Sequence, residues 1–353
     1  MNPVSLARIA GLLYLRHARR TPFPILDPKM FALPLFRNAI HAMGSSGSVR
    51  IVARVPGNTS LHDIAPDGRL LVARTDDRSG IAVRVPGESA ERDLSWLDSS
   101  NIAALSRDGR KVLFYEYGVG GGPNGSTYLR DTSGSAAVRL AEGTAHALSP
   151  SGDRAIVGVG DAPHLEVIPT GAGEGTRIAR TGLSLLGARW LPDGEQLLLR
   201  ARTAGGAERL YVTAVAGSGE VRQVTPDALS VAAGGWAVSP DGRTVAVSGR
   251  DTTELFPVAG GAMQRAQGIP PGWQVVGWID GGILVSESPE ASSEVFRVDP
   301  VTARRERWAE IRPGDPTGLM ILDLGTLVTT PDGRGYGYGW HRALSDLYIA
   351  EGV

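Results

Sequence analysis

The chain lacks the local motifs that usually position catalytic groups. It has no G-x-S-x-G nucleophile turn, H-E-x-x-H helix, Walker phosphate loop or EF-hand loop, and it has no cysteine. Residues 120–125 (G-G-G-P-N-G) satisfy the G-x-G-x-x-G pattern of dinucleotide sites, but such a site needs the loop to open a helix. Here the loop leads into Thr127-Tyr128-Leu129-Arg130, which has the character of a strand. We therefore predict an ordinary loop, no catalytic residue and no cofactor.

The histidines are the remaining candidates for metal binding or proton transfer. None of the six has the spacing of a local metal motif: His17, His41, His62, His146, His164 and His341. His62 and His146 stand at equivalent places in two copies of a repeat, so they could converge on the axis of a ring. A metal site there is an alternative; we expect instead hydrogen bonds to neighbouring repeats, and we predict no metal.

A repeat of about 44 residues runs through most of the chain. Its marker is a turn, P-D-G in full form, whose glycine recurs at Gly68, Gly109, Gly152, Gly194, Gly242, Gly282 and Gly333. Proline fixes φ and Asp-Gly supplies a corner with positive φ, so the motif has a physical reason to turn the chain. The repeated aspartates are therefore predicted to be structural.

Two kinds of strand follow each turn. The first is a short continuous apolar run, as in Leu197-Leu198-Leu199, which predicts a strand buried on both faces. The second alternates, as in Leu210-Tyr211-Val212-Thr213, and is expected nearer to solvent. Trp190 and Trp278 precede two of the turns and are predicted to fill the core rather than to stack on a ligand.

These units predict an all-β chain that forms a seven-bladed β-propeller with four-stranded antiparallel blades. Six blades is the alternative, because the sixth turn (Asp280-Gly281-Gly282) has no proline and the interval after it is long. The last unit is one strand short. Residues 49–55 (V-R-I-V-A-R-V) have the pattern of an outer strand and are predicted to complete the last blade, closing the ring.

We expect residues 47–353 to form one domain and residues 1–46 to be a basic, poorly ordered extension. The extension carries six Arg or Lys residues against one Asp. Its apolar run at residues 9–15 is too short to span a bilayer, and its positive charges follow the run, unlike those of a signal peptide. An amphipathic anchor is the alternative; we predict no membrane span and a cytoplasmic protein as encoded.

The overall charge is balanced, with 36 Lys and Arg against 37 Asp and Glu in 353 residues. No basic stripe is present of the kind that follows a phosphate backbone, so nucleic acid is not an expected partner. We predict a monomer.

The repeats A-P-D-G-R-L-L-V, S-P-D-G-R-T-V-A-V and T-P-D-G-R-G-Y-G-Y resemble those of TolB-type and WD-like bacterial propellers, over about 300 residues. The ending W-H-R-A-L-S-D-L-Y-I-A-E-G is similar to that of the C-terminal sensor propeller of bacterial eukaryotic-like Ser/Thr kinases. The resemblance implies a module that binds ligands or proteins and has no catalytic residues; it makes the periplasm an alternative location. The kinase glycine loop, V-A-I-K lysine and H-R-D loop are missing from this sequence, so phosphoryl transfer is unsupported.

In a propeller blade, the loops that lead into the inner strands and those between second and third strands lie at one end. The P-D-G turns lie at the other end. The first end is richer in charged loop residues, and we predict that it binds a protein, a peptide or a small polar ligand. The candidate binding residues are His62, Asp63, Arg74, His146, Arg189 and Arg200. The alternative is a propeller hydrolase or lyase with a metal or acid–base group in the central channel.

Overall fold

The chain divides into two compact units in the computed structural model. The structure describes residues 6–9, 12–15, 39–43, 49–54, 58–67, 69–160, 164–216, 220–226, 235–249, 251–287 and 293–350. Arg78–Arg342 form one unit, which we call the propeller unit, and Met1–Asp77 with Ala343–Val353 form the other, the terminal unit. None of the described residues lies in a helix, so no helix among them could cross a membrane.

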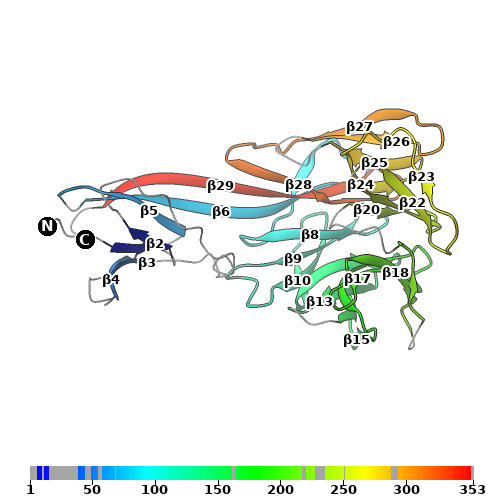
Figure 1. The fold of residues 1–353 in the computed structure, drawn as a ribbon, viewed down its shortest axis with the longest axis horizontal. Helices are drawn as coiled ribbons and strands as arrows, with labels where there is room; N and C mark the ends of the chain where they lie inside the picture. Colours follow the sequence, from blue (N-terminus) through cyan, green and yellow to red (C-terminus); the bar gives the residue numbers. More distant parts are fainter. Residues whose placement is uncertain are drawn as a thin grey trace. The chain divides into compact units, whose positions relative to one another are not determined.

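Five blades of the propeller unit are four-stranded antiparallel sheets built from consecutive strands (Figure 1). The first blade consists of β8 (Ser100–Leu105), β9 (Lys111–Glu116), β10 (Ser126–Asp131) and β11 (Val138–Glu142). The second consists of β12 (Thr144–Leu148), β13 (Arg154–Gly158), β14 (Leu165–Pro169) and β15 (Thr176–Ile178). The third consists of β16 (Ser184–Trp190), β17 (Gln196–Arg202), β18 (Arg209–Ala214) and β19 (Arg222–Gln223).

The fourth blade consists of β20 (Trp236–Val238), β21 (Thr244–Ser248), β22 (Thr253–Pro257) and β23 (Gln264–Arg265). The fifth consists of β24 (Gln274–Ile279), β25 (Gly282–Ser286), β26 (Ser293–Val298) and β27 (Arg305–Ile311). The centre of the second strand is buried in all five of these blades. In the third, fourth and fifth blades its central residues are 0% exposed: Leu197, Leu198, Leu199, Val245, Ala246, Val247, Ile283, Leu284 and Val285. This confirms the prediction of strands buried on both faces. The third strand β18 departs from the expectation of greater exposure, because residues 209–213 are all buried.

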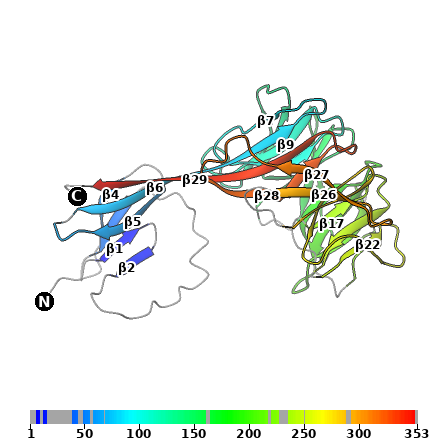
Figure 2. The same cartoon turned by 90° about the horizontal axis from the view of Figure 1, so that it is seen from above.

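The sixth blade joins the two ends of the propeller unit. Its inner strands come from β28 (Leu319–Thr329) and β29 (Tyr336–Ala350), near the C-terminus. β29 pairs with β6 (Leu70–Arg84), and β6 pairs with β7 (Glu91–Asp93), so both outer strands come from the N-terminal side. Figures 1 and 2 both show β29 running beside β6. The ring is thus closed by two strands supplied from the other end of the chain.

The predicted blade count and closing strand are corrected by this topology. The described residues form six blades, not seven, as in the alternative that the sequence left open. β4 (Val49–Arg54), which covers most of the predicted closing strand, pairs with β3 (Ala39–Met43) instead. The ring is closed instead by the segment around Ile81 and Val83. Both side chains are fully buried (0% exposed), and this burial stabilises the closed arrangement.

The terminal unit contains a further four-stranded sheet and a hairpin. The sheet has the order β2 (Leu12–Leu15), β1 (Leu6–Ile9), β3, β4, and β5 (Asn58–Ile64) pairs with the first part of β6. The predicted domain boundary at residue 46 differs from this division. The reason is that β6 and β29 are 15-residue strands, each of which begins in one unit and ends in the other.

The repeated turns are held by a hydroxyl group as well as by proline and glycine. The Ser106, Ser239 and Thr330 hydroxyls each donate to the turn aspartate two residues later, at 2.6 Å. Each also accepts from a backbone N–H five residues later, at 2.9 to 3.0 Å. These hydroxyl bonds are the largest cause of the lowered pKa of Asp108, Asp241 and Asp332. At these three turns, the small residue before the turn therefore has a hydrogen-bonding role.

The turns also lock neighbouring blades together. Gly242, in the fourth blade's turn, has φ +74°, and a Cβ there would lie 2.6 Å from the ring of Pro192 in the third blade's turn. Gly152 has the same φ, but a Cβ there would meet nothing within 4 Å. The two glycines therefore separate the cost of backbone strain from the cost of contact between blades.

The closing strand β7 is held to β29 by a carboxylate clamp. Tyr336 and Tyr338 each donate a hydroxyl hydrogen to Glu91, one to each carboxylate oxygen, at 2.6 Å. Burial and then the Glu91 hydrogen bond raise the pKa of both tyrosines, so they stay neutral donors. Both ionic and aromatic groups of the two chain ends thus take part in closing the ring.

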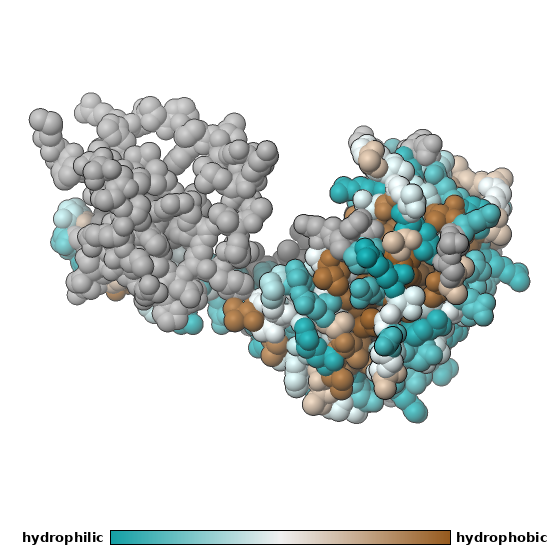
Figure 3. Space-filling model, turned by 90° about the horizontal axis from the view of Figure 1, so that it is seen from below, coloured by the Kyte–Doolittle hydropathy of each residue, from teal (hydrophilic) through white to brown (hydrophobic). Residues whose placement is uncertain are grey.

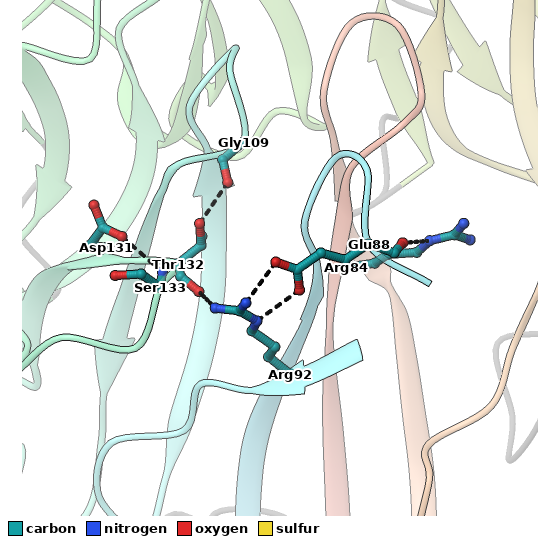
Figure 4. Close-up of polar contacts among 7 residues, drawn as sticks. All are labelled: Arg84, Glu88, Arg92, Gly109, Asp131, Thr132 and Ser133. Atoms are coloured by element: carbon teal, nitrogen blue, oxygen red, sulfur yellow. Dashed lines mark hydrogen bonds and ion pairs between the residues drawn. The ribbon is translucent and has the colours of Figure 1, made fainter. Parts of the chain in front are cut away.

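β7 is also tied to the first blade (Figure 4). The Arg92 guanidinium donates to the Glu88 carboxylate at 2.6 and 2.9 Å and to the Thr132 carbonyl oxygen at 3.0 Å. The Thr132 hydroxyl in turn donates to the Gly109 carbonyl oxygen at 2.9 Å. The junction between the last and first blades is therefore bonded on both sides of β7.

We expect Gly242→Ala to destabilise the protein more than Gly152→Ala. Both substitutions place a Cβ at φ +74°, which costs about 1–2 kcal/mol. Only the first adds a collision with a proline ring, which typically costs a further ~1–3 kcal/mol. Urea unfolding of the two variants measures the difference, and equal midpoints would show that the turns do not pack as described.

We expect Glu91→Gln to lower the free energy of unfolding by about 1–3 kcal/mol, because one tyrosine hydroxyl loses its charged acceptor. Glu88→Gln is the matched control in the same segment. Its carboxylate pairs with Arg92 while more than a third of each side chain is exposed, so we expect a loss below about 1 kcal/mol. A larger loss in the control than in Glu91→Gln would contradict the clamp.

Candidate functional site

The six inner strands share the wall of one cavity in the propeller unit, with a volume of about 250 Å³. β8, β12, β16, β20, β24 and β28 each contribute to it, through residues such as Ala104, Ala147, Trp190, Val238, Trp278 and Val328. Prolines of four turns also line it: Pro150, Pro192, Pro240 and Pro331. We call this the central cavity; it lies toward the turn ends of the inner strands.

A second cavity, of about 340 Å³, lies at the opposite ends of the inner strands of the second and third blades. Thr144 and Ser184 begin these inner strands, His164 lies in the connection between β13 and β14, and Arg202 ends β17. The sequence predicted that segments of these two kinds share one end of the blades, and here they meet. We call this the mouth cavity.

His146 lines both cavities. It stands at a β-bulge of β12, where the register shifts between Ala145 and Ala147. Its ring fits beside two glycines: a Cβ on Gly158 would lie 2.8 Å from Nε2, and one on Gly187 would lie 3.5 Å from Nδ1. The bulge and the glycines together place an imidazole in the wall between the cavities.

His146 is neutral at physiological pH. Burial, and then the positive charge of Arg200, lower its pKa to about 4. A neutral imidazole has one N–H donor and one acceptor nitrogen. His146 can therefore give the cavities hydrogen-bonding groups but no charge.

Arg189 and Arg200 are the positive charges near His146. The Arg189 guanidinium stacks over the Trp236 ring, with its Cζ 4.6 Å from the ring centre, and burial and then Arg200 lower the pKa of Arg189 to about 10. Arg200 Nε lies 3.7 Å from the Glu208 carboxylate. Arg189 was expected at the beginning of its inner strand. It is instead the last residue but one of β16 and lines the central cavity.

The structure places the other three candidate residues elsewhere. His62, Asp63 and Arg74 lie on the β5–β6 hairpin of the terminal unit, with exposed side chains. The nearest contact described for His62 is a 3.1 Å hydrogen bond between Nε2 and the Ser60 hydroxyl. The propeller unit therefore brings together His146, Arg189 and Arg200, and the hairpin carries the remaining three.

Sequence reasoning missed several of the residues that line the cavities. Arg107 lines the central cavity at the place where most repeats have proline, S-R-D-G instead of S-P-D-G, and that departure is visible in the sequence. Thr144, Ser184 and Arg202 have no such signal, because hydroxyl and charged residues are common in loops.

Groups suited to metal or acid–base chemistry are sparse in this part of the structure. Among the described residues, no three His, Asp or Glu side chains come together as a metal site. Glu116 is a fully buried carboxylate, and burial raises its pKa. It accepts from the Leu97 and Ser99 amides, at 3.2 and 3.3 Å, and from the Ser100 hydroxyl. These hydrogen bonds hold residues 97–100 in place, which gives Glu116 a structural role.

We expect His146 to make folding stability depend on pH between about 6.5 and about 4. In this range the unfolded chain binds a proton that the folded protein excludes, so the free energy of unfolding falls as pH falls. His146→Gln removes this contribution, and its stability should fall less between pH 7 and pH 4.5 in urea unfolding. His62→Gln makes the same change on an exposed side chain and should behave as wild type. An unchanged slope in His146→Gln would contradict the burial of this ring.

Comparison with known proteins supports the fold. No family model and no curated protein matches the sequence. A TolB-type protein from Agrobacterium tumefaciens has a TM-score of 0.55 at 16% identity, covering 75% of this chain and 98% of its own. A chain of a nidogen/laminin complex has a TM-score of 0.52 at 13% identity, covering 69% and 96%.

An oligogalacturonate lyase from Vibrio parahaemolyticus has a TM-score of 0.48 at 14% identity, covering 73% of this chain and 77% of its own, which is too low to inform about chemistry. Identities at this level establish architecture only. The antiparallel blades, the ring closed between the two chain ends and these similarities together show that the chain has a TolB-like β-propeller fold.

Proposed function

We propose that the propeller unit is a non-catalytic binding module that takes a small polar ligand or a segment of a partner protein in the mouth cavity. The observation that carries the proposal is the composition of that cavity. Its wall combines the neutral imidazole of His146, the hydroxyl groups of Thr144 and Ser184, and the guanidinium of Arg202. A cavity of about 340 Å³ is within the range of small-molecule sites, about 300–1,000 Å³.

The wall is suited to hydrogen bonding. None of the described residues that line the mouth cavity is an acid. A pair of carboxylates, as general acid–base catalysis of glycoside cleavage requires, is thus lacking among them. The cavity instead offers donors and acceptors on a rigid frame, because its walls are strand ends of two packed blades. Rigid donors lower the entropy lost when a ligand binds.

The surface of the propeller unit is mixed, as expected for a module that meets polar partners. On the face that Figure 3 shows, hydrophilic and apolar residues are interspersed over this unit. Signalling together with a Ser/Thr kinase is the biological setting that the repeat resemblance supports. A propeller hydrolase or lyase remains the alternative from another class.

Two variants test the proposal against the mouth cavity. Arg202→Glu reverses its charge, and Ser184→Tyr fills it. We expect both to lose ligands or proteins that wild type retains in pull-downs from the organism that encodes the chain. Arg243→Glu reverses an exposed charge at a P-D-G turn, at the other end of the blades, and should retain them.

Loss only in Arg243→Glu would move the binding surface to the turn end and overturn the proposal. Metal analysis of the purified protein addresses the alternative. A stoichiometric bound metal, together with turnover of a substrate, would favour an enzyme.

A further inference from the structure

We propose that the central cavity is a second binding site, specific for an organic carboxylate, which Arg189 and Arg107 hold. This site is separate from the mouth cavity and goes beyond the proposed function. The argument rests on the charge of the wall, on the absence of a counter-charge among the described residues, and on the aromatic and apolar character of the rest.

The positive charge of the cavity is not neutralised within the described structure. Arg107 and Arg189 line it, and no Asp or Glu does so among the residues whose side chains are described, a set that leaves out residues 320–326 of β28. Asp280 occupies the turn position equivalent to Arg107 but does not line the cavity. No hydrogen bond or ion pair joins either arginine to those described side chains, and the contact described for Arg189 is with the Trp236 ring. Two arginines therefore line the cavity without a described carboxylate beside them.

Arg189 is held over an aromatic ring. Its guanidinium Cζ lies 4.6 Å from the centre of the Trp236 ring. A cation–π contact of this kind leaves the N–H groups of a guanidinium available to other partners. Burial and the nearby Arg200 lower the pKa of Arg189 to about 10, which shows that its positive charge is costly in this position. An anion bound at Arg189 would relieve that cost, and a carboxylate matches the guanidinium in a bidentate pair.

The rest of the wall suits a ligand with an apolar body. Trp190 and Trp278 line the cavity together with alanine, valine, leucine and proline side chains. Strongly hydrated inorganic ions would gain little from such walls, which favours an organic carboxylate.

Benzoate is a suitable probe, because it combines a carboxylate with a flat apolar ring. We expect saturable binding to the wild-type chain in isothermal titration calorimetry at low salt. Benzamide, its neutral analogue, and inorganic phosphate should each bind at least about tenfold more weakly. Benzamide lacks the negative charge, and phosphate lacks the apolar ring. To separate a free ligand from a peptide end, a short acetylated peptide with a free C-terminal carboxylate is compared with its amidated form.

The variants identify the site. Arg189→Lys keeps the charge but loses the bidentate geometry, and Arg107→Gln removes the second charge; each should weaken benzoate binding by about tenfold or more. Arg243→Gln, at a turn of the same end, and Ser184→Tyr in the mouth cavity should bind benzoate as wild type does. Thermal unfolding of each variant shows whether it is folded. Because Arg107 is exposed, we expect Arg107→Gln to fold, so this variant keeps the test valid if Arg189→Lys does not fold.

Equal affinity for benzoate and benzamide, or unchanged benzoate binding in Arg107→Gln, would overturn the proposal. So would phosphate binding as tightly as benzoate, which would indicate a general anion site. Loss of binding in Ser184→Tyr would place the ligand in the mouth cavity instead. Because the two cavities are tested by different variants, failure here leaves the proposed function of the mouth cavity intact.

Discussion

Closure of the ring is the constraint on which the rest of the propeller unit depends. The two ends of the unit meet where Tyr336 and Tyr338 donate to the carboxylate of Glu91, across 245 and 247 residues of sequence. Long-range contacts of this kind carry a loop-closure cost that grows only slowly with length, so a few buried hydrogen bonds and apolar side chains can offset it. Without β6 and β7, the sixth blade would expose an unpaired edge.

The turns carry this constraint from blade to blade. At the fourth blade's turn, the Ser239 hydroxyl fixes the turn aspartate, and Gly242 packs on Pro192 of the preceding blade's turn. The hydroxyl bond recurs with the same length at two other turns, from Ser106 and Thr330. These turns lie at the ends of inner strands that line the central cavity.

The two cavities differ in the groups that line them. In the mouth cavity, Thr144 and Ser184 supply hydroxyl groups, His146, which is neutral, and His164 supply imidazoles, and Arg202 supplies a guanidinium. In the central cavity, Arg189 is held by stacking on Trp236, which leaves its hydrogen-bonding capacity unused among the described residues. Stacking thus keeps a guanidinium in place without cancelling its charge. This difference is the physical basis for assigning the cavities different ligands.

Local sequence was sufficient for the fold class and for the turns. Continuous apolar runs such as Leu197-Leu198-Leu199 are buried as predicted, and the turn chemistry of P-D-G depends only on neighbouring residues. Arg107 could also have been singled out, because it replaces the expected proline. The blade count and the closing strand could not be obtained in this way. The β5–β6 hairpin has the same local pattern as a blade. Which strands it pairs with is decided by long-range packing, which the local pattern does not show.

The composition of the site depended on tertiary structure for a second reason. β-bulges shift the register of β12 and β16, between Ala145 and Ala147 and between Leu185 and Gly187. A shift of one residue turns the following side chains to the other face of a strand. Nothing in the sequence marks these bulges, so alternation alone could not show that Arg189 lines the central cavity. The sequence by itself determined which elements form, and the packing of six blades decided which side chains face the axis.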